Sequence, residues 1–141
     1  MKTRIPEQLR RLVIQRAKLC CEYCLLHQDD EPTYSHEIDH VIAEKHAGIT
    51  AESNLALSCF YCNRFKGSDI ASIDPSTEQI TPLFNPRSQQ WTDHFLLDGP
   101  LIVPLTAEAR ATVRLLQLNR PRIVQRRIYL IQLGRYPREN A

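Results

Sequence analysis

Two C-x2-C pairs, Cys21–Cys24 and Cys59–Cys62, restrict the fold of this 141-residue chain more than any other feature. Each pair places two thiols on one short turn, which is half of a tetrahedral metal site. Four thiolates complete the coordination of zinc and leave no position for water or substrate, so such a site is structural. We therefore predict a structural zinc ion held by these four cysteines, which joins the first helix to the strand–helix unit that follows it. A redox C-x-x-C motif does not explain the second pair, and simple burial of the thiols is the other alternative.

The remaining composition agrees with a folded domain whose thiols are reduced. Hydrophobic residues make up 43% of the chain and charged residues 24%, as in globular proteins. No apolar run follows Lys2, Thr3 and Arg4, and the aliphatic stretch 101–105 is too short to span a bilayer. We expect a cytoplasmic protein without a membrane segment. Cys20 is expected to be a packed or spare thiol, although a switch with Cys21 stays open.

Residue spacing predicts a mixed α+β fold. In residues 1–70, the apolar residues of segment 5–18 recur at helical spacing, residues 34–42 and 55–58 have the pattern of short strands, and a helix begins after Cys59 and stops near Gly67. In residues 71–141, segment 72–90 is predicted to be an irregular connector, followed by a β-hairpin over 94–105 that turns at Asp98-Gly99. Thr106 is expected to cap a helix over 107–118, and Pro121 to start a last helix that ends at Gly134.

Charge is uneven along the chain, although the net charge is only +2. Eight arginines and no acidic residue lie between Arg110 and Arg138. Arginine binds phosphate with a planar fork and stacks on bases, so this segment could form a nucleic-acid face. The alternative is a helical surface on which the arginine stems cover apolar neighbours.

Four residues suited to catalysis or metal binding lie between and beside the cysteine pairs, namely Asp39, His40, Asn54 and Asn63. Each alone is a weak signal, because a single His or Asn most often has a structural role. Together with the cysteines they form a pattern: Glu37-Ile-Asp-His-Val-Ile42, Gly48, Asn54-Leu-Ala-Leu-Ser-Cys59 and Cys62-Asn-Arg-Phe-Lys66-Gly67.

This pattern resembles the HNH endonucleases of the His-Me finger (ββα-metal) group, in the subset with two C-x2-C pairs. The resemblance covers roughly residues 10–70 and implies a ββα-metal motif held by a four-cysteine zinc site in residues 1–70. Residues 71–141 would form a connector, a β-hairpin and an arginine-rich helical extension that packs on it. Two positions differ from the family pattern. Ala43 stands where many members have Pro, and Gly48-Ile49 stands where they have two glycines.

The resemblance also implies a role for each residue of the pattern. His40 would be the general base that takes a proton from water, and Asn54 would hold the loop that orients it. Asp39 and Asn63 would bind a catalytic Mg²⁺ or Mn²⁺ ion through oxygen atoms.

Three neighbouring residues could assist this site. Lys66 and Arg64 are candidates for contacts to the DNA backbone. Glu37 lies on the same side of the predicted strand as Asp39, and it either supports the metal or faces solvent.

We therefore predict a metal-dependent DNA endonuclease that leaves a 5′ phosphate and a 3′ hydroxyl. The alternative is a non-catalytic zinc module that binds nucleic acid. Whether the chain acts as a monomer or as a homodimer stays open at this stage.

Overall fold

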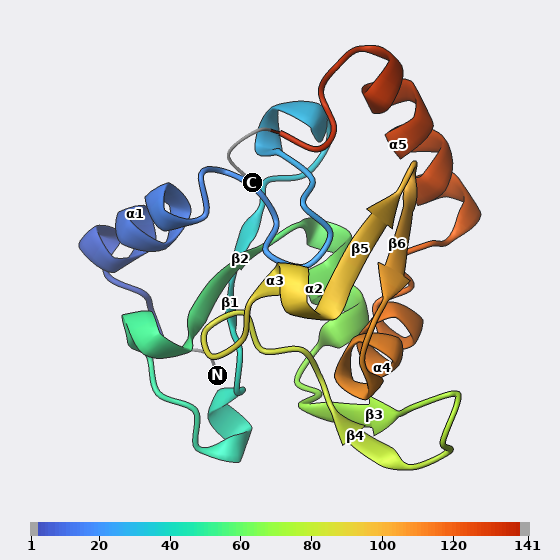
Figure 1. Cartoon of the computed structure of the whole chain (residues 1–141). Helices are drawn as coiled ribbons and strands as arrows, with labels where there is room; N and C mark the ends of the chain where they lie inside the picture. Colours follow the sequence, from blue (N-terminus) through green and yellow to red (C-terminus); the bar gives the residue numbers. More distant parts are fainter. Residues whose placement is uncertain (1–2, 139–141) are drawn as a thin grey trace.

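The computed structural model describes residues 3–138 and confirms the α+β class. Three short antiparallel pairs of strands alternate with helices in the described residues (Figure 1). Along the chain, the elements are α1 (Glu7–Arg16), η1 (Gln28–Asp30), β1 (Glu37–His40), η2 (Glu44–His46), η3 (Glu52–Asn54), β2 (Leu55–Ser58), α2 (Phe60–Lys66), β3 (Ala71–Ile73), β4 (Ile80–Pro82), α3 (Trp91–His94), β5 (Phe95–Asp98), β6 (Leu101–Pro104), α4 (Ala107–Leu115) and α5 (Pro121–Gln132).

Strands β1 and β2 and helix α2 form a ββα unit, as the sequence predicts. The strands pair antiparallel, with Glu37 opposite Ser58 and His40 opposite Leu55. Cys59 caps α2 because its sulfur accepts a hydrogen bond from the Cys62 amide. The helix packs against β1, so its side chains lie next to the acidic residues of that strand.

Helix α1 covers the other side of this small sheet. Its fully buried residue, Val13, packs in a cluster with Ala17 of the following turn and with Ile38, Leu55 and Leu57 of the strands. The alternation of a strand places Ile38 toward this cluster and its neighbours Glu37 and Asp39 toward α2. One face of β1 therefore anchors the fold, and the opposite face carries polar side chains.

The prediction of an irregular connector over residues 72–90 was wrong. This segment contains the β3–β4 hairpin, in which Ala71 pairs with Pro82 and Ile73 with Ile80. Asp74 organises the turn, because its carboxylate accepts hydrogen bonds from the Ser76 amide and the Thr77 hydroxyl. Each strand has only three residues and ends close to a proline, so the alternating pattern is too short to recognise.

The predicted C-terminal hairpin and two helices are confirmed. Strands β5 and β6 pair as expected, although the two residues of the turn are Gly99 and Pro100 rather than Asp98 and Gly99. Thr106 caps α4 by accepting a hydrogen bond from the Ala109 amide, and Pro121 starts α5. Figure 1 shows the β5–β6 hairpin beside α4, with α5 following at the edge of the molecule.

The main hydrophobic core contains residues from both halves of the chain and surrounds the cysteines. The hydroxyl of Tyr136, near the end of the described chain, donates to the Cys24 carbonyl over 2.8 Å. The C-terminal extension therefore packs directly on the cysteine turns. Its buried members include Phe84, Phe95, Ile102, Leu116, Leu118, Leu130 and Tyr136.

Most arginines of the C-terminal segment have partners within the protein. Arg110 forms a bidentate pair with Asp74, and Arg126 lies 2.7 Å from Glu31. Arg127 is 2% exposed and donates to backbone carbonyls. Arg135 and Arg138 both face Asp30. Asp30, Glu31 and Asp74 thus neutralise much of the positive charge of this segment. Within residues 3–138, no helix is both long and apolar enough to cross a membrane.

Candidate metal centre and active site

Four cysteine sulfurs meet at one buried point. The Sγ atoms of Cys21, Cys24, Cys59 and Cys62 all lie within 4.8 Å of one another. The distance between the sulfurs of Cys24 and Cys59 is 3.7 Å. A tetrahedron with Zn–S bonds of about 2.3 Å has edges of about 3.8 Å. The sulfur positions therefore fit a zinc ion, and the cluster is arranged to bind a metal as the two C-x2-C pairs predict.

The surroundings of the sulfurs also suit a metal site. The amide of Cys24 donates to the Cys21 sulfur, and the amide of Cys62 donates to the Cys59 sulfur. Hydrogen bonds within the cluster hold the pKa of Cys24 well below its ordinary value and raise the pKa of Cys59 and Cys62. Four sulfurs this close together ionise jointly only when a cation neutralises them. The cluster supports structural zinc binding.

Cys20 lies outside this cluster, although it is the neighbour of Cys21. Its thiol is buried, and burial raises its pKa to about 11. Its backbone pairs with His27 in an isolated β-bridge. A buried thiol with a raised pKa is a poor nucleophile, which agrees with the expected packing role.

Asp39 is a buried carboxylate with two donors around it. It is 5% exposed, and its Oδ2 atom lies 3.1 Å from Nζ of Lys66 and 3.0 Å from the hydroxyl of Tyr23. Burial raises the pKa of Asp39, whereas Lys66 and Tyr23 act in the opposite direction. Tyr23 belongs to the first C-x2-C turn, so the metal cluster and Asp39 are joined by one side chain.

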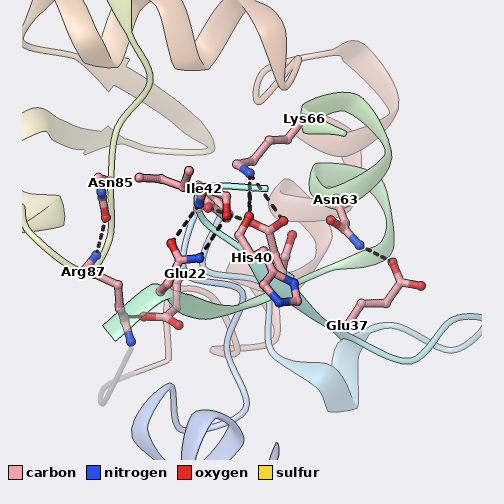
Figure 2. A network of polar contacts seen from close by, with 12 residues as sticks. Glu22, Glu37, His40, Ile42, Asn63, Lys66, Asn85 and Arg87 are labelled. Atoms are coloured by element: carbon pink, nitrogen blue, oxygen red, sulfur yellow. Dashed lines mark hydrogen bonds and ion pairs between the residues drawn. The ribbon is translucent and has the colours of Figure 1, made fainter. Parts of the chain in front are cut away.

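Lys66 is placed differently from what we expected of a DNA contact. Its side chain is only 2% exposed, and its ammonium also donates to the His40 carbonyl over 3.3 Å (Figure 2). The ammonium therefore binds the end of β1 and has little surface to offer to a phosphate. Helix α2 brings it there because Lys66 lies one turn after Asn63, on the face that packs on β1.

His40 ends β1 with its ring nearly buried. Its Nε2 atom lies 2.9 Å from the Thr50 hydroxyl and 3.2 Å from the Glu44 carboxylate. Both partners come from the loop between β1 and β2. In Figure 2 the ring lies below the Lys66 ammonium and to the left of Glu37.

Asn54 ties this loop together with three hydrogen bonds. Its Oδ1 accepts from the Ile42 amide, and its Nδ2 donates to the carbonyls of Ile42 and Ile49, all at 2.9 Å. Gly48 makes the close approach feasible, because a Cβ atom there would lie 1.6 Å from the Ile42 oxygen. The loop thus closes with Ala43 and a single glycine, despite the two departures from the family pattern.

Asn63 faces β1 from the second turn of α2. Its Nδ2 donates to Oε1 of Glu37 over 2.7 Å, as Figure 2 shows. This contact leaves the amide Oδ1 available as an oxygen ligand. Arg64 lies 3.5 Å from the other oxygen of Glu37, and its side chain is 56% exposed. Glu37 therefore faces α2 rather than open solvent.

One cleft, with a volume of about 470 Å³, brings most of the candidate residues together. Asp39, His40, Asn63 and Arg64 all line it, together with Glu44. Asn54 and Lys66 do not line the cleft, and they act on it through the loop and through Asp39. Sequence reasoning missed Tyr23, Glu44 and Thr50. The only sequence signal was that Glu44 is four residues after His40 and Tyr23 lies between two metal-site cysteines.

A two-stranded antiparallel sheet followed by a helix, with one cysteine pair before β1 and the other at the start of α2, defines this segment as a ββα unit with a metal-binding cluster. Residues 21–69 match the family model described as HNH endonuclease. This HNH segment indicates a nuclease or another nucleic-acid-binding function. No curated protein and no solved structure matches the chain.

Proposed function

We propose that the protein is a metal-dependent DNA endonuclease that hydrolyses phosphodiester bonds. The observation that carries this proposal is the shared cleft. A histidine, a carboxylate and an amide from the HNH segment, His40, Asp39 and Asn63, line one hollow large enough for a phosphate group. Hydrolysis of a phosphodiester needs a base for water and a positive charge beside phosphorus. The histidine can act as the base, and the two oxygen donors can hold a cation.

His40 is the proposed general base. Its imidazole accepts a proton from water, the water oxygen forms a bond to phosphorus, and the bond from phosphorus to the 3′ oxygen breaks. The products are a 5′ phosphate and a 3′ hydroxyl, the latter protonated from solvent. The backbone around His40 is held on both sides, by Lys66 at its carbonyl and by Asn54 at the loop beyond it.

Asp39 and Asn63 would hold the catalytic Mg²⁺ or Mn²⁺ ion. A carboxylate and an amide oxygen are hard donors, so the set fits such an ion better than zinc. When bound, the ion supplies charge neutralisation at the phosphate and stabilises the leaving 3′ oxygen. Glu37 orients the Asn63 amide so that its oxygen stays free for this task.

DNA contacts are proposed for Arg64 at the rim of the cleft. Its guanidinium is exposed and can bind a backbone phosphate next to the reacting one. The proposed role of Lys66 is different. Its ammonium holds Asp39 in place, because the pair is buried and hydrogen bonded.

The test is cleavage of supercoiled plasmid DNA by the zinc-loaded chain with added Mg²⁺ or Mn²⁺. His40→Ala should lower the rate by about 10²- to 10⁴-fold, the usual contribution of a general base. His46→Ala is the matched control, because His46 is an exposed residue of the same loop. Equal nicking by wild type and His40→Ala would refute the role of His40, and no cleavage with either ion would refute the enzyme.

The pairing of Asp39 with Lys66 favours a second candidate, a non-catalytic zinc module that binds nucleic acid. In that case the carboxylate serves only as the partner of the buried ammonium. Such a module should retard DNA equally in magnesium and in a chelator too weak to remove zinc, and it should never cut DNA.

A further inference from the structure

We propose that Glu44 and Thr50 are positioning residues for His40. They hold the imidazole proton on Nε2, so that Nδ1 stays free to accept the proton of water. The catalytic consequence rests on the proposed nuclease function, but the state of the imidazole is a property of the folded protein itself and can be measured without substrate.

The geometry at Nε2 distinguishes the two neutral forms of the ring. Both the Thr50 hydroxyl oxygen, at 2.9 Å, and the Glu44 carboxylate oxygen, at 3.2 Å, face this one nitrogen. An ionised carboxylate only accepts hydrogen bonds, so it attracts an N–H and repels a nitrogen lone pair. A hydroxyl tolerates either form. The carboxylate therefore decides that Nε2 carries the proton.

Glu44 is itself held in its ionised form and in position. Its Oε1 accepts from the Thr3 amide over 3.0 Å, and its Oε2 accepts from the Thr3 hydroxyl over 3.1 Å. These hydrogen bonds keep the pKa of Glu44 below its ordinary value. Polar contacts thus link Thr3 of the N-terminal segment to Glu44 of η2, and Glu44 to His40 at the end of β1.

Thr50 reaches His40 from the other side of the loop. The carbonyl of Ile49, its neighbour, accepts a hydrogen bond from Asn54, which ties this part of the loop to the start of β2. The two oxygens thus approach the ring from separate, separately anchored segments. Nδ1 has no hydrogen-bond partner within residues 3–138, and His40 lines the cleft with Asp39 and Asn63. The nitrogen that can accept a proton is therefore the one without a protein partner.

The direct test is a long-range ¹H–¹⁵N spectrum of the zinc-loaded chain at about pH 8, where an ordinary histidine is neutral. No divalent ion or DNA is added, and the ring signals of His40 are those missing from His40→Ala. We expect Nε2 to be protonated, with an N–H proton protected from solvent exchange. In the double variant Glu44→Ala, Thr50→Val, that protection should be lost and the two neutral forms should mix.

A proton on Nδ1 in the wild type, or an unchanged His40 spectrum in the double variant, would overturn the proposal. If the double variant unfolds, the same spectrum is recorded for the single variants Thr50→Val and Glu44→Ala. Thr50→Val keeps the shape of the side chain and removes only the hydroxyl. Glu52→Ala is the matched control, because Glu52 is an exposed acid of the same loop.

Cleavage kinetics give a second readout. The kcat of Glu44→Ala should fall about 10- to 100-fold, as for other residues that orient a catalytic group, with little change in the KM for DNA. A purely structural role of Glu44 would change the stability of the protein and leave the His40 spectrum as it is. Absence of cleavage in the wild type would refute the nuclease function alone, since the spectrum would still decide the state of the ring.

Discussion

The ammonium of Lys66 lies 3.1 Å from the carboxylate of Asp39, and both side chains are almost completely buried. The pair joins helix α2 to strand β1 at the edge of the cleft. A carboxylate in such a place needs a cation beside it, and in this structure the protein supplies that cation itself. The same carboxylate is the proposed ligand of the catalytic ion, so metal binding and this ion pair act on one group.

Replacing Lys66 by Met should destabilise the protein more than most single changes. The Asp39 carboxylate would stay buried without a partner, which costs about 3–5 kcal/mol of the free energy of unfolding. Chemical denaturation without added divalent ion measures this. Arg64→Met is the control, because its ion pair with Glu37 is exposed and should contribute less than about 1 kcal/mol. A similar loss in both variants would contradict the importance of the buried pair.

Loss of one zinc ligand should disturb the whole core. Cys59→Ser removes a sulfur from the cluster around which both halves pack, so we expect loss of bound zinc and a decrease in stability of more than about 4 kcal/mol. Elemental analysis and thermal unfolding measure the two effects. Cys20→Ser should keep one zinc per chain, because Cys20 lies outside the cluster. A full zinc content in Cys59→Ser would show that the cluster is not the binding site.

Gly48 should tolerate no side chain. An added Cβ would overlap the Ile42 oxygen and lie 2.9 Å from Nδ2 of Asn54, so Gly48→Ala must open the loop that positions His40. We expect a stability loss of about 2–3 kcal/mol, typical of unpaired buried polar groups, together with reduced cleavage. Gly134→Ala is a matched control with a positive φ of 71° and open space around it, so only backbone strain of about 1 kcal/mol is expected. Equal effects of the two variants would argue against the close loop contact.

The ion pair of Arg110 with Asp74 should make the free energy of unfolding depend on pH. Hydrogen bonds from Arg110 hold the pKa of Asp74 well below its ordinary value of 3.8. A carboxyl with a lowered pKa in the folded state stabilises the protein above its ordinary pKa, and this stabilisation disappears as the pH falls below it. Arg110→Gln should therefore unfold at a lower temperature than wild type at about pH 6, and the difference should shrink toward about pH 2. Thermal unfolding over this range measures it.

Arg114 is the control for that experiment. It is exposed on the same helix and has no ion-pair partner within residues 3–138, so Arg114→Gln should leave the unfolding temperature nearly unchanged. A difference between wild type and Arg110→Gln that stays constant down to about pH 2 would contradict the assignment to Asp74.

Local sequence patterns predicted a large part of the fold. The C-x2-C spacing identified all four cysteines of the cluster, and the Thr106 cap and Pro121 marked the starts of α4 and α5 correctly. These signals are short in sequence, because a turn or a helix start is decided by a few neighbouring residues. The β3–β4 hairpin escaped because strands of three residues have no recognisable period.

Long-range contacts account for what sequence reasoning could not see in the site. Lys66 follows the family motif and has the charge of a phosphate ligand, yet helix packing against β1 buries it beside Asp39. Several arginines of the C-terminal segment likewise face Asp30, Glu31 and Asp74. Their partners lie far away in the sequence, so no local rule pairs them.

By itself, the sequence determined which chemical groups are available, namely four sulfurs at two turns, one histidine beside one aspartate, and two asparagines in the order of the HNH pattern. Only the tertiary structure decided which groups meet. It placed the hydroxyl of Tyr23 and the ammonium of Lys66 beside the Asp39 carboxylate. It also placed the side-chain oxygens of Glu44 and Thr50 beside Nε2 of His40. The physical reason is that the strength of a charge or a hydrogen bond depends on distance and burial, and both arise only when segments far apart in the chain pack together.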